Sequence, residues 1–367
     1  MYKEYFKAFL EENKSKQLFE LHSPFYGLDT AKNAEFEYWN EIAKEDGERK
    51  EHFYQHEIPK VKQYIARILG INHPEQIVFA PAIHDIIKHF ISNFDRSANI
   101  NILTTDSKSF DFTMQMLGSA GLDQMTVYQV PVDPIDTFEE RFIEEAKSNK
   151  FNLIFFSQVF FNSAIPVRNP ERIINAVNDT DTIIVMDGSH AFLSISFDLR
   201  SVQNKLFFMA TIPAFTQEGK GACFLYRPKN KKWSEFMATD VAYSSLYAVM
   251  KVFELLEKVE LSQDKIHAYI QKMQSSFLEE IAKYDHPLIN ENNLVKHDLK
   301  RHGHFLTFKL DNAEQVEKMA QLLKEHEIIT DYSGDRLHFA FALYHDGNFD
   351  LSVLNTRRAY FFDELIF

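Results

Sequence analysis

Asp187 ends a run of apolar residues, and His190 follows it three positions later. The segment 154–164 passes from an apolar run into polar residues in the same way. In an open α/β sheet, ligands bind outside the carboxyl ends of the strands, so a carboxylate that ends a strand is placed to meet a ligand group. The same position suits an Asp whose side-chain oxygen caps the turn that follows. From the residues alone, both roles stay open for Asp187.

Other constellations in the chain are weaker. His302 and His304 stand at alternate positions before a predicted strand, but no third metal ligand is evident beside them. Residues 345–350 carry oxygen donors without the spacing and the terminal Glu of a calcium loop. Gly219-Lys220 lacks the other residues of a phosphate-binding P-loop, and the Gly-x-Ser-x-Gly elbow of a serine hydrolase does not occur. The sequence therefore predicts no metal site.

Predicted strands and helices alternate in the part of the chain that contains Asp187. Short apolar runs alternate with longer amphipathic segments through the middle of the chain, which is typical of βα units that build a mainly parallel sheet with helices on both faces. The predicted helices between the strands include 82–94 and 137–147, the second with Thr137 as its N-cap. The predicted strands are residues 76–80, 100–104, 126–130, 152–157, 182–187, 206–210 and 222–226.

After Asp240 the pattern changes to long helices and then to a shorter α/β segment. Because single hydrophobic cores stop growing at roughly 250 to 300 residues, two cores are expected in this chain. We predict an N-terminal helical segment, 1–60, that packs on the small domain, a large α/β domain, 61–255, and a small C-terminal α/β domain, 256–367. The elements predicted for this last part of the chain are helices 244–259, 262–284 and 313–326 and strands 304–310 and 336–342.

Composition limits the partners and the compartment. The 367 residues carry a net charge of −13, so neither a nucleic acid nor an anionic membrane is a predicted partner. The chain has no apolar stretch long enough to span a membrane and no signal-peptide pattern, so we expect a cytoplasmic protein. Cys223 is the single cysteine and lies in an apolar run, so we expect a buried residue in a reducing compartment rather than a nucleophile.

These segments resemble the pyridoxal-phosphate enzymes of the class V aminotransferase and kynureninase family. The resemblance rests first on Asp187-x-x-His190 and on the glycine-rich strand entry at 217–224. It implies fold type I, with a mainly parallel seven-stranded sheet in the large domain and a small C-terminal α/β domain. It also implies a homodimer with a small-molecule ligand in the interface cleft. Further matching segments are His22-Ser23, 58–71, 331–337 and 342–345.

The resemblance assigns roles to several residues. Asp187 would face the ring nitrogen of pyridoxal phosphate, because the cofactor withdraws electrons only while that nitrogen stays protonated. His190 would orient the ring or contact its oxygen, and Asn162 would be a polar contact to the same oxygen. The phosphate would meet backbone amides at a helix N-terminus, and the turn with Ala82, Ile83 and His84 is such a place.

The chain departs from the family at the lysine that forms an imine with the cofactor. Its place falls at Ala214, and no lysine occurs between Lys205 and Lys220. An alanine methyl group can neither form an imine nor move a proton, so ordinary transamination is expected to fail. Lys220 stands between two glycines and could be a displaced imine lysine, or simply a solvated lysine in a loop.

Three further subsites differ from the family. Ala82 stands where a polar phosphate contact is expected, and Lys108 lies within the segment, 107–111, that should supply an acidic and aromatic wall. His338 takes the place of the arginine that binds the substrate carboxylate, and imidazole cannot reproduce the arginine's two-pronged contact. Arg336 lies two residues away on the same face of the predicted strand, where it could substitute or form a surface ion pair.

Two functions follow from this resemblance, and whether the chain is an enzyme stays open. In the first, a family member without the catalytic lysine uses the old cofactor cleft for another ligand or reaction. In the second, an enzyme of amino-acid metabolism, a transaminase or a kynureninase-like lyase, binds pyridoxal or pyridoxamine phosphate noncovalently or through Lys220. The loss of imine, phosphate and carboxylate contacts together favours the first, and it argues against a tightly held cofactor.

Overall fold

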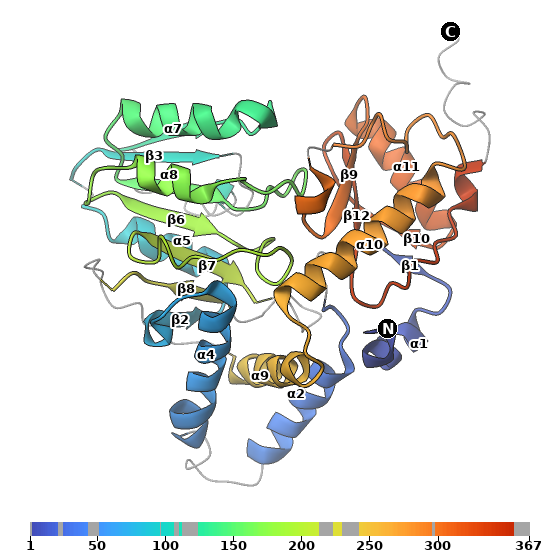
Figure 1. Ribbon diagram of the computed structural model, residues 1–367, viewed down its shortest axis with the longest axis horizontal. Coiled ribbons are helices and arrows are strands. Elements are labelled where there is room, and N and C mark those ends of the chain that lie inside the picture. Colours follow the sequence, from blue (N-terminus) through green and yellow to red (C-terminus); the bar gives the residue numbers. More distant parts are fainter. Residues whose placement is uncertain are drawn as a thin grey trace.

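The computed structural model of the protein describes residues 2–20, 25–42, 51–95, 97–105, 110–111, 124–212, 223–229, 242–295 and 298–355. The larger sheet has seven strands and lies in the left half of Figure 1, and the smaller sheet lies in the right half. Helix α10 (Gln263–Ile281) runs diagonally across the right half. Within the described residues, no helix combines the length and the apolar character that a bilayer crossing requires.

The seven-stranded sheet has the order β2-β8-β7-β6-β5-β3-β4. Only the two pairs made by β8 are antiparallel, and the other pairs run parallel. All seven predicted strands are present, with ends within one residue of the prediction, so the predicted α/β fold class with a mainly parallel sheet is confirmed. The strands are β2 (Ile77–Ala80), β3 (Ile100–Thr105), β4 (Met125–Val130), β5 (Leu153–Ser157), β6 (Ile183–Asp187), β7 (Leu206–Thr211) and β8 (Cys223–Tyr226).

Helices cover both faces of this sheet, as the sequence predicts. Alternate side chains of a strand point to opposite faces. Phe155 and Val185 accordingly pack under one helix layer, while their neighbours Ile154 and Met186 belong to the core on the other face. Residues buried on both faces explain why the central strands read as nearly continuous apolar runs. The first layer is α5 (Ile83–Ser92), and the second contains α7 (Phe138–Ser148) and α8 (Pro170–Ala176).

Thr137 stands at the N-cap position of α7, but its side chain makes no capping hydrogen bond. Its hydroxyl donates to the carbonyl oxygen of Pro134 at 3.3 Å and accepts from Nε of Arg141 at 3.2 Å. The capping role predicted for Thr137 is therefore wrong. The hydroxyl turns back toward the short 3-10 helix η4 (Ile135–Thr137), away from the first-turn amides of α7.

The smaller sheet has three antiparallel strands in the order β11-β12-β9. Its main strands and helix were predicted, whereas the short strand β11 was not. Ser262 caps α10 by accepting a hydrogen bond from the backbone N–H of Lys265 at 3.3 Å. The remaining elements of this part are α9 (Tyr243–Lys258), η5 (Leu299–Arg301), β9 (Phe305–Lys309), α11 (Ala313–Glu325), β11 (Asp331–Ser333), β12 (Arg336–Ala340) and η6 (Ser352–Asn355).

The N-terminal residues pack against elements that follow the seven-stranded sheet in the chain. Strand β1 (Gln17–Leu18) pairs in parallel with β10 (Ile328–Ile329), and α2 (Asp29–Ile42) packs against α9. The boundaries predicted near residues 60 and 255 fall inside helices α4 and α9, so the three-part division stays a prediction. The other elements here are η1 (Tyr2–Phe6), α1 (Lys7–Glu12), the π-helix η2 (Phe53–Glu57), α4 (Ile58–Leu69) and η3 (Pro74–Gln76).

The end of α4 is fastened to the chain that follows β6. Gly70 caps this helix with a left-handed φ of 69°, and a Cβ added there would lie 2.5 Å from Oδ1 of Asp198. The backbone N–H of Leu199 donates to the carbonyl oxygen of Leu69 at 2.9 Å. A left-handed backbone and a contact this close both require glycine at position 70.

Candidate functional site

Asp187 ends β6 at the edge of the sheet that faces the smaller sheet, and its side chain is buried. Its Oδ1 accepts hydrogen bonds from the backbone N–H of Ser189 at 2.9 Å and from the Ser189 hydroxyl at 2.6 Å. The Ser189 hydroxyl in turn accepts from the backbone N–H of Thr211 at 3.4 Å. The carboxylate therefore caps the next turn and is held in one orientation at the strand end. The two roles that the sequence left open are compatible.

Cys223 lies close to Asp187, which the sequence did not predict. It begins β8 in register with Ala80 of β2 and Thr211 of β7. Burial raises the pKa of the Cys223 thiol to about 12, and the negative charge of Asp187 adds to the effect, while a backbone hydrogen bond from Ile83 opposes it. The thiol is therefore protonated at neutral pH, and its burial agrees with the prediction.

The N-terminus of α5 reaches the same place, because the Ile83 backbone contacts Cys223. Ala82 occupies the N-cap with an extended backbone and provides no side-chain cap for the first turn. Burial lowers the pKa of His84, and the charge of Lys88 adds to this, so a neutral imidazole is favoured here. The contacts of Cys223 thus show that the start of α5 and the carboxylate of Asp187 lie at one edge of the sheet.

His190 belongs to a group of five rings, the ring cluster, which joins the two sheets. Its ring centroid lies 5.4 Å from that of Phe161 and 6.0 Å from that of His304. His338 contacts Phe161 and Phe305 from the other side, with 5.5 Å between centroids in both pairs. His338 and Phe305 have no exposed surface, so His338 is a core residue of the small sheet as well as the predicted substrate position.

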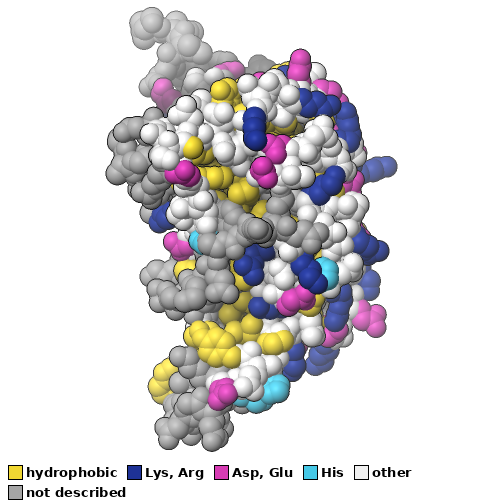
Figure 2. Space-filling view, turned by 90° about the vertical axis from the view of Figure 1, so that its left-hand side faces the viewer, with side chains coloured by type: hydrophobic (Ala, Val, Ile, Leu, Met, Phe, Trp, Pro, Cys, Tyr) yellow, Lys and Arg dark blue, Asp and Glu magenta, His cyan; other side chains and the backbone are white. Residues whose placement is uncertain are grey.

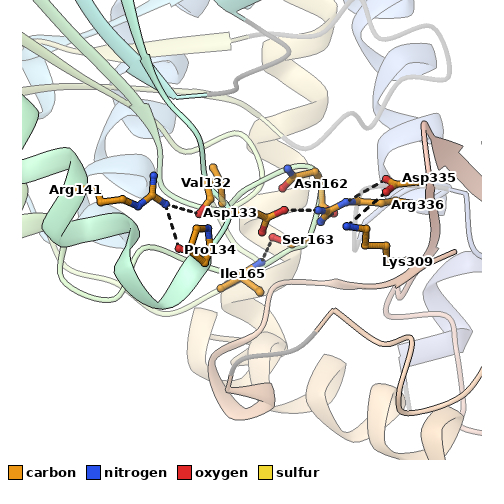
Figure 3. A network of polar contacts seen from close by, with 10 residues as sticks. All are labelled: Val132, Asp133, Pro134, Arg141, Asn162, Ser163, Ile165, Lys309, Asp335 and Arg336. Carbon is orange, nitrogen blue, oxygen red and sulfur yellow. Dashed lines mark hydrogen bonds and ion pairs between the residues drawn. The ribbon is translucent and has the colours of Figure 1, made fainter. Parts of the chain in front are cut away.

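Arg336 and Asn162 meet in a network that spans the two sheets (Figure 3). Nη1 of Arg336 donates to the backbone oxygen of Asn162 at 2.9 Å, and Nη2 lies 2.7 Å from Oδ2 of Asp133. A longer ion pair of 3.7 Å joins Nε to Asp335. The Arg336 side chain is only 10% exposed, whereas Asp133 is 59% exposed, so their ion pair is shielded from solvent on the arginine side only.

The structure gathers some of the predicted site residues and leaves others out. Asp187 and the start of α5 lie together, and His190 and His338 share the ring cluster, to which Phe161 links the Asn162 loop. Ala214, Lys220 and Lys108 lie outside the described residues, as do His22 and most of the glycine-rich entry 217–224.

His302 and His304 are both buried, and burial lowers the pKa of His302 to about 4. Among the residues that the structure describes, no group of three or more His, Cys, Asp or Glu side chains could hold a metal ion.

Comparison with known proteins gives the fold a context. No family model and no curated protein sequence matches this chain. Solved structures do match it over nearly its whole length, at low sequence identity. A cysteine desulfurase from Thermococcus onnurineus is 13% identical, with a TM-score of 0.69 over 94% of this chain and 93% of the other. The cysteine desulfurase CsdA from Escherichia coli is 10% identical, with a TM-score of 0.70 over 96% and 95%.

A third similar structure is a variant of C-DES, a cystine C–S lyase, in which alanine replaces a lysine and glycine is covalently linked to the pyridoxal-phosphate cofactor. It is 14% identical, with a TM-score of 0.72 over 96% of this chain and 97% of the other. The chain therefore has the fold type I architecture of pyridoxal-phosphate-dependent, class V aminotransferase-like proteins. At such identities the likeness concerns the fold alone.

Proposed function

We propose that this chain is a repurposed class V aminotransferase-like protein. In this proposal its cleft holds pyridoxal phosphate, or another phosphorylated pyridine, without an imine lysine, and the protein no longer processes amino acids by the usual route of the family. The proposal rests on the two residues expected to bind the substrate carboxylate. Arg336 already donates hydrogen bonds to Asp133 and Asn162, and His338 packs between the rings of Phe161 and Phe305.

A substrate carboxylate needs a guanidinium that is free to form two parallel hydrogen bonds. Both terminal nitrogens of Arg336 already donate to oxygen atoms of the large-sheet loops. His338, at 0% exposure, cannot reach a ligand without opening the ring cluster. The α-carboxylate of an amino acid would therefore have to displace Asp133, which is unfavourable because the existing contacts are intramolecular and well formed.

The residues expected to hold the cofactor suit their role better than those expected to bind the substrate. A carboxylate held like that of Asp187 suits a protonated ring nitrogen, and the start of α5 suits a phosphate. Pyridoxal phosphate would supply an electron-withdrawing ring. Asp187 would keep the ring nitrogen protonated, and the Cys223 thiol close to Asp187 would stay neutral. With Ala214 at the imine position, no side chain there can move a proton. The C-DES variant is an example of the same fold that retains the cofactor with alanine in place of a lysine.

The alternative is a working transaminase or kynureninase-like lyase that attaches the cofactor through Lys220. The arrangement around Asp187 favours attachment through Lys220 as much as noncovalent binding. In either case a carboxylate must hold the ring nitrogen of the cofactor. A titration with pyridoxal phosphate, followed by borohydride reduction and peptide mapping, separates the two. Saturable binding that dialysis reverses supports the proposal, whereas a label fixed on Lys220 supports the alternative.

Matched variants make this titration decisive. Asp187→Asn keeps the shape and removes the charge, so we expect an affinity loss of about tenfold or more. Asp350→Asn is the control, because Asp350 also caps a turn, accepting from the Ser352 N–H at 3.1 Å, but lies elsewhere. No saturable spectral change in the parent protein, or equal binding by both variants, rules out cofactor binding at Asp187.

We also propose that the protein works as a cytoplasmic homodimer with the cleft near the interface. A single, buried cysteine fits a reducing compartment. Phe36 and Trp39 of α2 are 73% and 69% exposed and lie three positions apart, hence on one face of the helix. Figure 2 shows hydrophobic side chains gathered at the lower end of the molecule, the height at which Figure 1 places α2 and α4. Exposed apolar surface of this kind marks interaction sites.

A further inference from the structure

A second cavity lies away from the cofactor-type site, between three segments. Its walls are the end of α4, the chain 193–200 after β6, and the junction of α9 with α10. Its volume is about 500 Å³, within the range of small-molecule sites in proteins. The segment that presents Asp187 and His190 to the sheet edge continues to Leu193 on the cavity floor, so the two sites are distinct but lie along one stretch of chain.

The floor of the cavity is apolar and rigid. Leu193, Phe253 and Leu261 line it and are themselves buried. Phe197 adds an aromatic face and packs on Phe208 of β7 at 5.5 Å between ring centroids, so its orientation is set by the core. Aromatic and aliphatic walls of this kind favour a flat apolar group.

The rim carries more negative than positive charge. Four carboxylates and two guanidiniums line the cavity. Arg67 pairs with Glu257 at 2.8 Å, and Arg200 with its neighbour Asp198. In the part of the chain that the structure describes, Glu260 and Asp264 have no lysine or arginine within ion-pairing distance. Two carboxylates on the rim are thus left to attract a cation.

Asp264 is held beside the cavity. Its side chain accepts a hydrogen bond from the Ser196 hydroxyl, and both residues line the cavity.

Two of the five non-glycine residues with left-handed φ angles in the described part of the chain line this cavity. They are Leu193, with a φ of 60°, and Glu260, with a φ of 52°. Strained backbone of this kind is found preferentially at functional sites.

We propose that this cavity binds a small organic cation with a flat apolar body and a protonated amine, an arylalkylammonium. The aromatic group lies on Phe197 and Leu193. The ammonium group faces the carboxylates of Glu260 and Asp264. This site does not depend on the proposed function, because none of its residues takes part in cofactor binding.

Three phenyl compounds of similar length test the charge preference. Calorimetric titration with 2-phenylethylammonium is expected to give a dissociation constant on the order of 1 mM or below, typical of a ligand of nine heavy atoms. The anion 3-phenylpropionate is expected to bind at least about tenfold more weakly, and neutral 2-phenylethanol in between. Similar affinities for cation and anion, or no binding of the cation, would overturn the proposal.

Variants locate the site. Glu260→Gln and Asp264→Asn are each expected to weaken binding of the cation about threefold, since rim charges are partly screened. Ser196→Phe should block the cavity, with thermal melting as a check of folding. Glu279→Gln is the matched control on the exposed face of α10. Binding that is insensitive to Glu260→Gln, Asp264→Asn and Ser196→Phe would place the ligand elsewhere and refute the assignment.

Discussion

Arg336 of β12 donates a hydrogen bond of 2.7 Å to Asp133, a residue that lies 203 positions earlier in the chain. With the 2.9 Å bond to the backbone of Asn162, this contact ties the smaller sheet to two loops of the larger one. The guanidinium is nearly buried, whereas Asp133 is 59% exposed. The pair therefore helps to fix the relative position of the two sheets, and both terminal nitrogens of Arg336 are already used as hydrogen-bond donors.

Replacement of Arg336 by methionine is expected to lower the free energy of unfolding by about 1–2 kcal/mol, because two charge-assisted hydrogen bonds are lost and one partner is partly solvated. Arg200→Met is the control, since Arg200 and its partner Asp198 are both more than half exposed, and a change below about 0.5 kcal/mol is expected there. Urea unfolding measures both variants. Equal losses of stability in Arg336→Met and Arg200→Met would mean that the pair of Arg336 with Asp133 contributes no more than the exposed pair of Arg200 with Asp198.

Gly188 lies directly after Asp187 and touches the ring of Phe208. A Cβ added at Gly188 would stand 2.1 Å from Cζ of Phe208, so Gly188→Ala is expected to destabilise the fold by about 1–3 kcal/mol through overpacking. The double variant with Phe208→Leu should recover part of the loss, because it makes room for the new methyl group. Thermal or urea unfolding of the three variants tests this. If the loss of stability in the double variant equals the sum of the losses in the two single variants, the contact with Phe208 does not cause the destabilisation by Gly188→Ala.

Cys223 should resist thiol reagents in the folded protein. Because burial and Asp187 raise its pKa to about 12, the thiolate that attacks such reagents is scarce at pH 8. We expect labelling by an aromatic disulfide reagent to be slow in buffer and rapid in urea, and the single cysteine makes the readout unambiguous. Rapid labelling of the folded protein would mean that β8 opens at the edge that carries Asp187.

The central strands could be predicted because their sequences are apolar on both faces, and β5 and β6 are typical examples. The pairing of β1 with β10 could not, since two residues give no periodic signal and the partners lie more than 300 positions apart. Asp187 was found from its place after an apolar run. Its neighbour Cys223 was missed because only the antiparallel insertion of β8 between β2 and β7 brings it there. Likewise, only the packing of β9 and β12 against the Phe161 loop reveals that His338 is a core residue.

Two buried histidines predict a loss of stability in acid. Burial lowers the pKa of His302 and of His345 to about 4, below the ordinary value of 6.5. Protonation is therefore less favourable in the folded than in the unfolded state. The stability that each provides is complete above pH 6.5 and is lost as the pH falls toward 4, by an amount on the order of 2–3 kcal/mol each.

Urea unfolding between pH 7.5 and 4.5 measures this loss. His302→Gln should flatten the profile, because it removes one group that must stay neutral. His326→Gln, at the exposed end of α11, is the control and should leave the slope unchanged. A profile that His302→Gln does not alter would assign the acid sensitivity to other groups.

The exposed face of α2 gives the last prediction. If Phe36 and Trp39 meet a second copy of the chain, the double variant Phe36→Ser/Trp39→Ser should shift the protein from dimer to monomer in light scattering after gel filtration. Burial of two large side chains contributes several kcal/mol, enough to change the dissociation constant by about a hundredfold or more. Val127→Ser is the control, because Val127 is 43% exposed and belongs to β4, the edge strand of the seven-stranded sheet. A parent protein that is monomeric, or a double variant that stays dimeric, would remove α2 from the interface and leave its apolar face to another partner.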